Sequence, residues 1–168
     1  MPMRDHFCML ARYHVWASEK LLAAVAAVDE SDYRRDCGLF FASVHGTLNH
    51  MLVAESIWHA RLAEGVSPRL ALNAELETGR AALATALRAA ARRWGDWLQA
   101  LPPQRFDGNL DYRRTSGEPV SVPLAGALAH VFNHGTHHRG QVTAALTGIG
   151  HACPEIDLIY FLAAEGKQ

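Results

Sequence analysis

Apolar residues return at three- and four-residue steps through four long stretches of the chain, which is the spacing that places them on one face of an α-helix. The stretches cover about Asp5 to Val28, Leu39 or Ser43 to Glu64, Ala74 to Leu101, and Ser121 or Pro123 to Leu146. Polar or glycine- and proline-containing segments separate them. The pattern therefore predicts four long helices.

Residues that end or begin helices support these limits. Gly65 can end the second helix in the left-handed conformation, and Pro68 follows shortly after it. Pro102 and Pro103 end the third helix, and proline is tolerated in the first turn of a helix, as at Pro123. The third helix is predicted to bury a stripe and to expose three basic residues. The stripe is Leu76, Leu83, Leu87, Trp94 and Leu98, and the basic residues are Arg88, Arg92 and Arg93.

Two shorter segments complete the expected fold. Residues Phe106 to Val122 read as a small β-hairpin or an ordered loop, with Gly117 in the turn. The segment from Pro154 to Leu162 predicts a short apolar helix. Four long helices in 168 residues predict an all-α fold, a four-helix bundle that forms one domain over residues 1–168.

Composition narrows the function classes. The formal net charge is −1, so no electrostatic footprint for nucleic acid or an anionic membrane is present, and neither partner is expected. The chain has no apolar run of about 18 residues and no signal-peptide core at its beginning. Cys8, Cys37 and Cys153 are far apart and lack CxxC spacing, which predicts free thiols in a reducing compartment. These features predict a cytoplasmic protein.

Histidine is the residue type that points to chemistry. The chain has ten, and four of them lie between positions 130 and 138. His134 and His138 are four residues apart, so one face of a helix can offer both imidazoles to a metal ion. His50, among small and apolar neighbours in the second helix, is the best candidate for a third ligand. Three imidazoles and a water form an open zinc-type site. Packed or hydrogen-bonded histidines in a bundle core are the alternative interpretation.

Other residues are candidates for supporting roles. His45 lies five residues before His50 and is rotated off its face, so it is a weaker ligand candidate. His14, Trp16 and Glu19 lie in the first helix, and any of them could face a cavity, although Glu19 also suits a solvated face and Trp16 a packed one. Gly126, Gly135 and Gly140 lie inside the fourth helix. A close approach of a neighbouring backbone or ligand, or packing alone, would explain why glycine is tolerated there.

The catalytic residues are less clear than the metal ligands. Gly-Thr-His stands between His134 and His138, where an HExxH metalloprotease has its glutamate, so peptide hydrolysis by that route is not expected. A general base must come from elsewhere. The candidates are His137, His130, Glu19 and Glu55. His137 also suits a role behind the ligands, and Arg139 either holds an anionic substrate group or forms an ordinary salt bridge.

With these motifs in place, the sequence resembles the DinB/YfiT-like family of metalloenzymes. The resemblance covers nearly the whole chain. It rests on Tyr13-His-Val-Trp16, Val44-His-Gly-Thr-Leu-Asn-His50, Ile57-Trp58, Tyr112 to Pro119, His130-Val-Phe-Asn-His134-Gly-Thr-His-His138-Arg-Gly-Gln141 and Asp157-Leu-Ile-Tyr160. It implies a four-helix bundle of up-down-down-up topology, often dimeric, with a divalent metal such as zinc or nickel on His50, His134 and His138. Position 14 departs from the pattern, because this chain has histidine there and the resemblance implies asparagine.

Three functions remain open at this point. The metal activates a low-molecular-weight thiol, as in some relatives, for transfer to a small electrophile or isomerisation. Alternatively, metal-bound hydroxide hydrolyses a small substrate. In the third hypothesis, the chain binds metal for structure or in a stress response and catalyses nothing.

Overall fold

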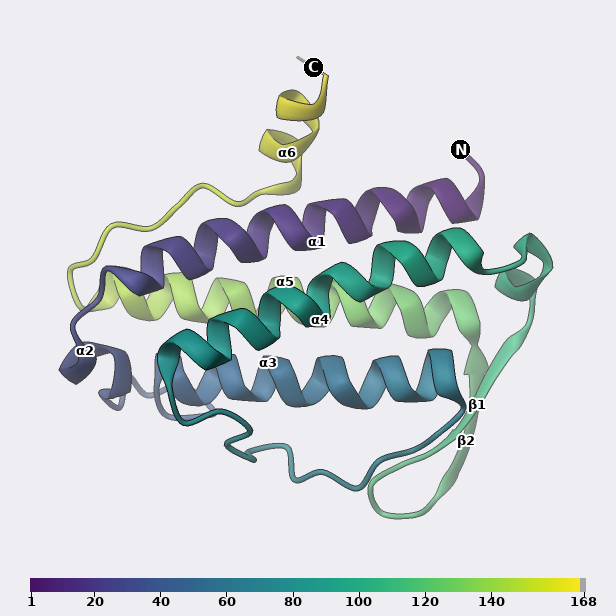
Figure 1. Ribbon diagram of the computed structural model, residues 1–168, viewed down its shortest axis with the longest axis horizontal. Coiled ribbons are helices and arrows are strands. Elements are labelled where there is room, and N and C mark those ends of the chain that lie inside the picture. The colour runs from purple at the N-terminus through teal and green to yellow at the C-terminus, as the bar shows by residue number, and fades with distance from the viewer. Residues whose placement is uncertain (167–168) are drawn as a thin grey trace.

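The computed structural model describes residues 1–166, and four long helices form the body of the molecule (Figure 1). They are α1 (Met3–Ala26), α3 (Val44–His59), α4 (Arg80–Ala100) and α5 (Leu124–Gly148). The helices α1 and α5 run in one direction, and α3 and α4 run in the other. This is the up-down-down-up order that the family resemblance implies, and it confirms the predicted four-helix bundle. The parallel pair α3 and α4 needs a long crossover, residues 65–79.

The smaller elements lie at the ends of the bundle, except α6, which packs on the side of α1. They are α2 (Glu30–Arg34), the π-helical turn η1 (Ala60–Glu64), the 3₁₀ turn η2 (Pro103–Asp107), β1 (Asn109–Arg113), β2 (Pro119–Pro123) and α6 (Leu158–Glu165). The strands β1 and β2 are antiparallel, with Leu110 opposite Val122 and Tyr112 opposite Val120. Gly117 has a φ of 92° in the turn between them. The predicted hairpin and the short C-terminal helix are both present.

The helix α4 begins six residues later than predicted. The stripe of Leu83, Leu87, Trp94 and Leu98 is buried as expected, but Leu76 lies in the crossover and is 37% exposed. The reason is a side chain from another helix. Asn49 accepts the backbone N–H of Glu77 and donates to its carbonyl oxygen, both at 3.0 Å. These bonds hold the backbone of Glu77 outside any helix, and periodicity within the segment could not reveal them.

The sequence suggested that the basic residues on α4 are solvated, but two of them form ion pairs. Arg88 Nε and Arg92 Nη2 each donate to a carboxylate oxygen of Glu19 at 2.8 Å. Glu19 therefore links α1 to α4. The sequence pattern of α4 does not indicate which residues of other helices pack against it, so the pairing with Glu19 could not be predicted.

The cysteines and the hydropathy of the helices bear on two expectations from composition. Cys8, Cys37 and Cys153 are free thiols, as predicted. Within residues 1–166, no helix is long and apolar enough to cross a membrane.

Candidate metal centre

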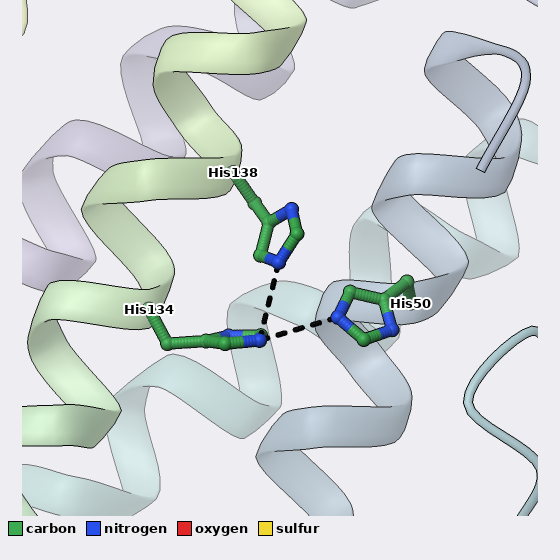
Figure 2. A group of neighbouring side chains, drawn as sticks. All are labelled: His50, His134 and His138. Atoms are coloured by element: carbon green, nitrogen blue, oxygen red, sulfur yellow. Dashed lines mark hydrogen bonds between the residues drawn. The ribbon is translucent and has the colours of Figure 1, made fainter. Parts of the chain in front are cut away.

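Three imidazoles from two helices converge inside the bundle. His50 projects from α3, and His134 and His138 project from successive turns of α5 (Figure 2). His134 Nε2 lies 3.2 Å from His50 Nε2 and 3.1 Å from His138 Nε2. The three residues can offer one ligand atom each, and these atoms lie within 4.8 Å of one another. The structure therefore brings together the three histidines that the sequence singled out.

The hydrogen bonds of the Nδ1 atoms, which point away from the cluster, show which ring nitrogens present a lone pair to its centre. His50 Nδ1 lies 2.8 Å from the carbonyl oxygen of Leu72, and His138 Nδ1 lies 2.7 Å from Gln141 Oε1. Both partners are acceptors, so each Nδ1 carries the proton and donates it. In a neutral imidazole the other nitrogen is then an acceptor. The Nε2 atoms of His50 and His138 are therefore free to bind a metal, with their rings fixed from behind.

The cluster has too few protons to satisfy itself. His134 Nε2 can donate at most one hydrogen bond, although it faces two acceptors, Nε2 of His50 and Nε2 of His138. A cation among the three nitrogens satisfies all of them. Zinc–nitrogen bonds of about 2.0–2.1 Å in tetrahedral geometry separate the nitrogens by about 3.3 Å. The observed spacings of 3.1 and 3.2 Å fit that requirement.

The protonation states also suit metal binding. Burial, and then the neighbouring His138 and His50, lower the pKa of His134 to about 3. Burial lowers the pKa of His138 to about 4, and it lowers the pKa of His50 as well. All three imidazoles are therefore neutral at pH 7, which is the form that binds a metal.

Neighbouring residues fix the position and orientation of the His50 ring. Phe41 stacks on the His50 ring, with centroids 3.8 Å apart. A Cβ on Gly46 would lie 2.1 Å from the Phe41 carbonyl oxygen, so only glycine allows the preceding segment to approach α3 this closely. Asn49 anchors the crossover that supplies the Leu72 carbonyl. Gly46 and Asn49 thus hold the two contacts that orient His50.

A cavity of about 290 Å³ opens beside the imidazoles. His50 and His134 form part of its wall, together with Trp58, Arg61, Tyr112 and His130, among others. A ligand in this space would lie next to the imidazoles of His50 and His134. Three protein ligands leave a coordination position open, and within residues 1–166 the cluster contains no fourth histidine, cysteine or carboxylate.

Of the candidates for a general base, His130 is the one beside the cavity, although its side chain is itself exposed. It lines the cavity, and its ring centroid is 5.5 Å from that of His134. Burial, and then the charge of Arg61, lowers its pKa. His137 is exposed on the outer side of α5, and Glu19 is bound to the two arginines of α4. The weaker ligand candidate His45 bonds to Tyr33 and Glu75 and is not part of the cluster.

Glu55 and Arg139 belong to a second buried group, which is centred on His14. Arg139 Nη1 lies 2.8 Å from His14 Nδ1, and His14 Nε2 lies 2.8 Å from Glu55 Oε1. An arginine can only donate, so His14 Nδ1 accepts and His14 Nε2 carries the proton that it gives to Glu55. The other carboxylate oxygen of Glu55 accepts the Trp94 indole N–H at 2.5 Å. A neutral histidine thus connects a buried carboxylate to a buried guanidinium.

This network removes Glu55 and Arg139 from the reactive candidates and explains a glycine. Burial raises the pKa of Glu55, but His14 and the Trp94 hydrogen bond lower it more, so its net pKa is below the usual value. Arg139 also donates to Thr136 Oγ1 at 3.0 Å. A Cβ on Gly135 would lie 2.8 Å from His14 Cε1. Sequence patterns showed Gly135 as unusual but could not show the ring that packs on it.

A known protein family matches nearly the full length of the chain. Residues 3–168 match the model of the DinB family. The chain belongs to the DinB family. One DinB relative among characterised sequences is "Protein DinB" of Bacillus subtilis (strain 168), which is 25% identical over 166 residues, 95% of each chain.

A solved structure has the same fold. It is YfiT from Bacillus subtilis, described as "a probable metal-dependent hydrolase with an unusual four-helix bundle topology". The two structures superpose with a TM-score of 0.70 over 89% of each chain, at 18% sequence identity. The likeness extends to the arrangement of the four long helices of this DinB protein.

Proposed function

We propose that this DinB protein is a metal-dependent hydrolase of a small molecule, with a divalent ion, zinc or nickel, on His50, His134 and His138. The observation that carries the proposal is that two of these imidazoles form the wall of the cavity of about 290 Å³. An ion at a closed structural site has four protein ligands and no substrate space. The description of YfiT as "a probable metal-dependent hydrolase" supports the same reaction class.

Each residue has a defined task in this proposal. His50, His134 and His138 hold the ion, while Leu72 and Gln141 keep the rings of His50 and His138 oriented. A divalent ion of this kind polarises a carbonyl or phosphoryl oxygen and lowers the pKa of a bound water to about 7. His130 lines the same cavity and can accept a proton from the attacking water or return one to the leaving group.

The proposal is tested with simple ester substrates and a matched pair of variants. Zinc- or nickel-loaded wild type is expected to hydrolyse p-nitrophenyl acetate or p-nitrophenyl phosphate above the rate of the metal-free protein. His138→Ala should abolish this activity, and the neighbouring exposed His137→Ala should retain it. Equal rates for loaded wild type and His138→Ala with both substrates would contradict a hydrolytic role for the cluster.

Thiol-dependent transfer, dimer formation and a cytoplasmic location stay predictions. No contact within residues 1–166 bears on the thiol chemistry that the family resemblance implied. A cobalt-substituted protein tests it directly, because a thiolate ligand changes the cobalt spectrum. An unchanged spectrum on addition of cysteine and other low-molecular-weight thiols would remove this function.

A further inference from the structure

The cavity beside the three histidines contains an arginine that no reaction step above uses. Arg61 is 7% exposed and lies in the π-helical turn η1, where α3 departs from regular α-helical geometry. Such π-helical turns occur frequently at functional sites. The guanidinium lies between two aromatic rings, 4.9 Å from the Trp58 centroid and 4.4 Å from the Tyr112 centroid. Its plane is therefore held in place before any ligand arrives.

The charge of Arg61 has no counterion in the fold. Its Nη2 donates to the Arg113 carbonyl oxygen at 3.1 Å, and its buried Nε has no hydrogen-bond acceptor within residues 1–166. Arg61 also forms no ion pair with any described carboxylate. A buried cation without a partner is costly. Arg139 also has a buried Nε without an acceptor in residues 1–166, but its Nη1 contacts His14, which donates to the Glu55 carboxylate.

The surroundings of Arg61 add positive charge and no negative charge. Among the described residues, no aspartate or glutamate lines the cavity. Arg114 lies at its edge, where its Nη1 is 3.5 Å from Glu118 Oε2 and both side chains are mostly exposed. A divalent ion on three neutral imidazoles would bring two further positive charges to the same space. An anionic ligand satisfies both this field and the free donors of Arg61.

From these contacts, we infer that the substrate carries a carboxylate or phosphoryl group that binds Arg61, with a small apolar body that packs between Arg61 and the histidine cluster. Ala54, Ile57 and Leu72 supply the apolar wall for that body. A volume of about 290 Å³ lies at the lower end of the range for small-molecule sites. The substrate class is therefore a small organic acid or phosphate ester derivative. This inference rests on the proposed function, because it takes the cavity as the substrate pocket.

The experiment measures ligand binding, so its result does not depend on whether the protein is a hydrolase. Benzoate and phenyl phosphate are the two anionic probes, and benzamide is the neutral probe of similar shape. Each is titrated calorimetrically into wild type, Arg61→Met, Arg61→Lys and Arg105→Met, in metal-free and zinc-loaded forms. Arg105 is an exposed arginine of η2 outside the cavity, so its variant has the same charge change without the same loss of contact.

At least one anionic probe is expected to bind wild type more tightly than benzamide, with and without zinc. Arg61→Met should weaken that probe about tenfold or more, as loss of a charge-assisted hydrogen bond does. Arg105→Met should leave binding unchanged. The probe that binds more tightly distinguishes a carboxylate from a phosphoryl substrate. Should Arg61→Met fail to fold, Arg61→Lys, which keeps the charge but loses the planar fork, is still expected to weaken binding.

Three results would overturn the inference. The first is equal binding of benzamide and both anions by wild type, or no binding of any probe. The second is unchanged anion binding in both Arg61→Met and Arg61→Lys. The third is an anion preference that disappears with the metal, since the ion alone would then hold the anion. Loss of metal binding with anion binding intact would contradict the proposed hydrolase and leave the role of Arg61 standing.

Discussion

Two buried polar groups share α3 and α5, and they differ in how their nitrogen and oxygen atoms are satisfied. In the group around His14, the Trp94 indole N–H, both carboxylate oxygens of Glu55 and both ring nitrogens of His14 are paired, and only Arg139 Nε lacks an acceptor among the described residues. In the group of His50, His134 and His138, acceptor nitrogens face one another at 3.1 and 3.2 Å. The first group satisfies its histidine and its carboxylate within the fold. The second has more acceptors than protons, which a bound cation would resolve, and it borders a cavity.

The difference separates a structural role from a reactive one. Histidine, arginine and glutamate occur in both kinds of site, so residue type alone does not decide the role. His14 uses both ring nitrogens within the protein, and Glu55 uses both carboxylate oxygens. The three clustered histidines instead direct nitrogens toward a shared point. Changing one group should therefore affect stability, and changing the other should affect metal binding.

The largest expected effect comes from removing the buried carboxylate. Glu55→Ala leaves the His14 and Trp94 N–H groups without an acceptor and leaves the buried Arg139 charge uncompensated. Breaking a buried charge pair in this way costs about 3–5 kcal/mol. Urea denaturation of the metal-free protein measures the change. A loss below about 1 kcal/mol would show that the network does not hold the helices together, since that is the range of exposed pairs.

Acid should destabilise the metal-free protein through the histidine cluster. The pKa values of His134 and His138 are lowered in the fold to about 3 and about 4, from 6.5. The unfolded chain therefore takes up protons first, and the free energy of unfolding falls as the pH drops below about 6.5. Each unit of pH costs about 1.4 kcal/mol for one such histidine, or roughly 2 kcal/mol by pH 5.

Denaturant midpoints between pH 7.5 and pH 5 test this dependence. His134→Ala should flatten the curve because it removes the histidine with the largest shift. His137→Ala should follow wild type because that side chain is exposed. Parallel curves for wild type and His134→Ala would mean that the cluster is protonated in the fold.

The packing of His14 on α5 can be tested with two glycines of the same helix. Gly135→Ala places a Cβ 2.8 Å from His14 Cε1 and 3.1 Å from Arg139 Nη1, so it should cost about 1–3 kcal/mol. Gly140→Ala meets no atom within 4 Å and should stabilise the helix by about 0.5–1 kcal/mol. Thermal unfolding compares the two. Equal effects at both positions would show that His14 does not constrain α5.

The sequence predicted the helices and the His134–His138 pair because both depend on local spacing. The stripe of Leu83, Leu87, Trp94 and Leu98 and the pair His134 and His138 each follow from the helical repeat. The late start of α4 did not follow, because Asn49 holds Glu77 from 28 residues away. Contacts between distant segments leave no periodic signal.

For the same reason, the sequence predicted only part of the candidate site. Leu72 and Gln141 orient two of the rings, yet a backbone carbonyl carries no residue-type signal and a glutamine has many roles. The free charge of Arg61 was also missed, since Trp58 and Tyr112 come together around it only when the hairpin packs on η1. Glu55 and Arg139 were listed among reactive candidates because His14, their common partner, lies in another helix.

The smallest effect is expected at the exposed carboxylate that also links two helices. Glu19 accepts from Arg88 and Arg92, and its side chain is 37% exposed. Glu19→Ala should change the free energy of unfolding by no more than about 1 kcal/mol, because water screens both pairs. Urea denaturation beside Glu55→Ala gives the contrast between an exposed and a buried carboxylate. Similar losses for the two variants would remove that contrast.

The most direct measurement is the metal content of untagged protein, determined by elemental analysis after reconstitution and removal of loosely bound ions. The account predicts about one divalent ion per chain for wild type, for His137→Ala and for a folded His14→Ala variant, and none for His138→Ala. A His138→Ala protein that keeps its ion, or a wild type that binds none, would contradict the claim that the three histidines form a metal site.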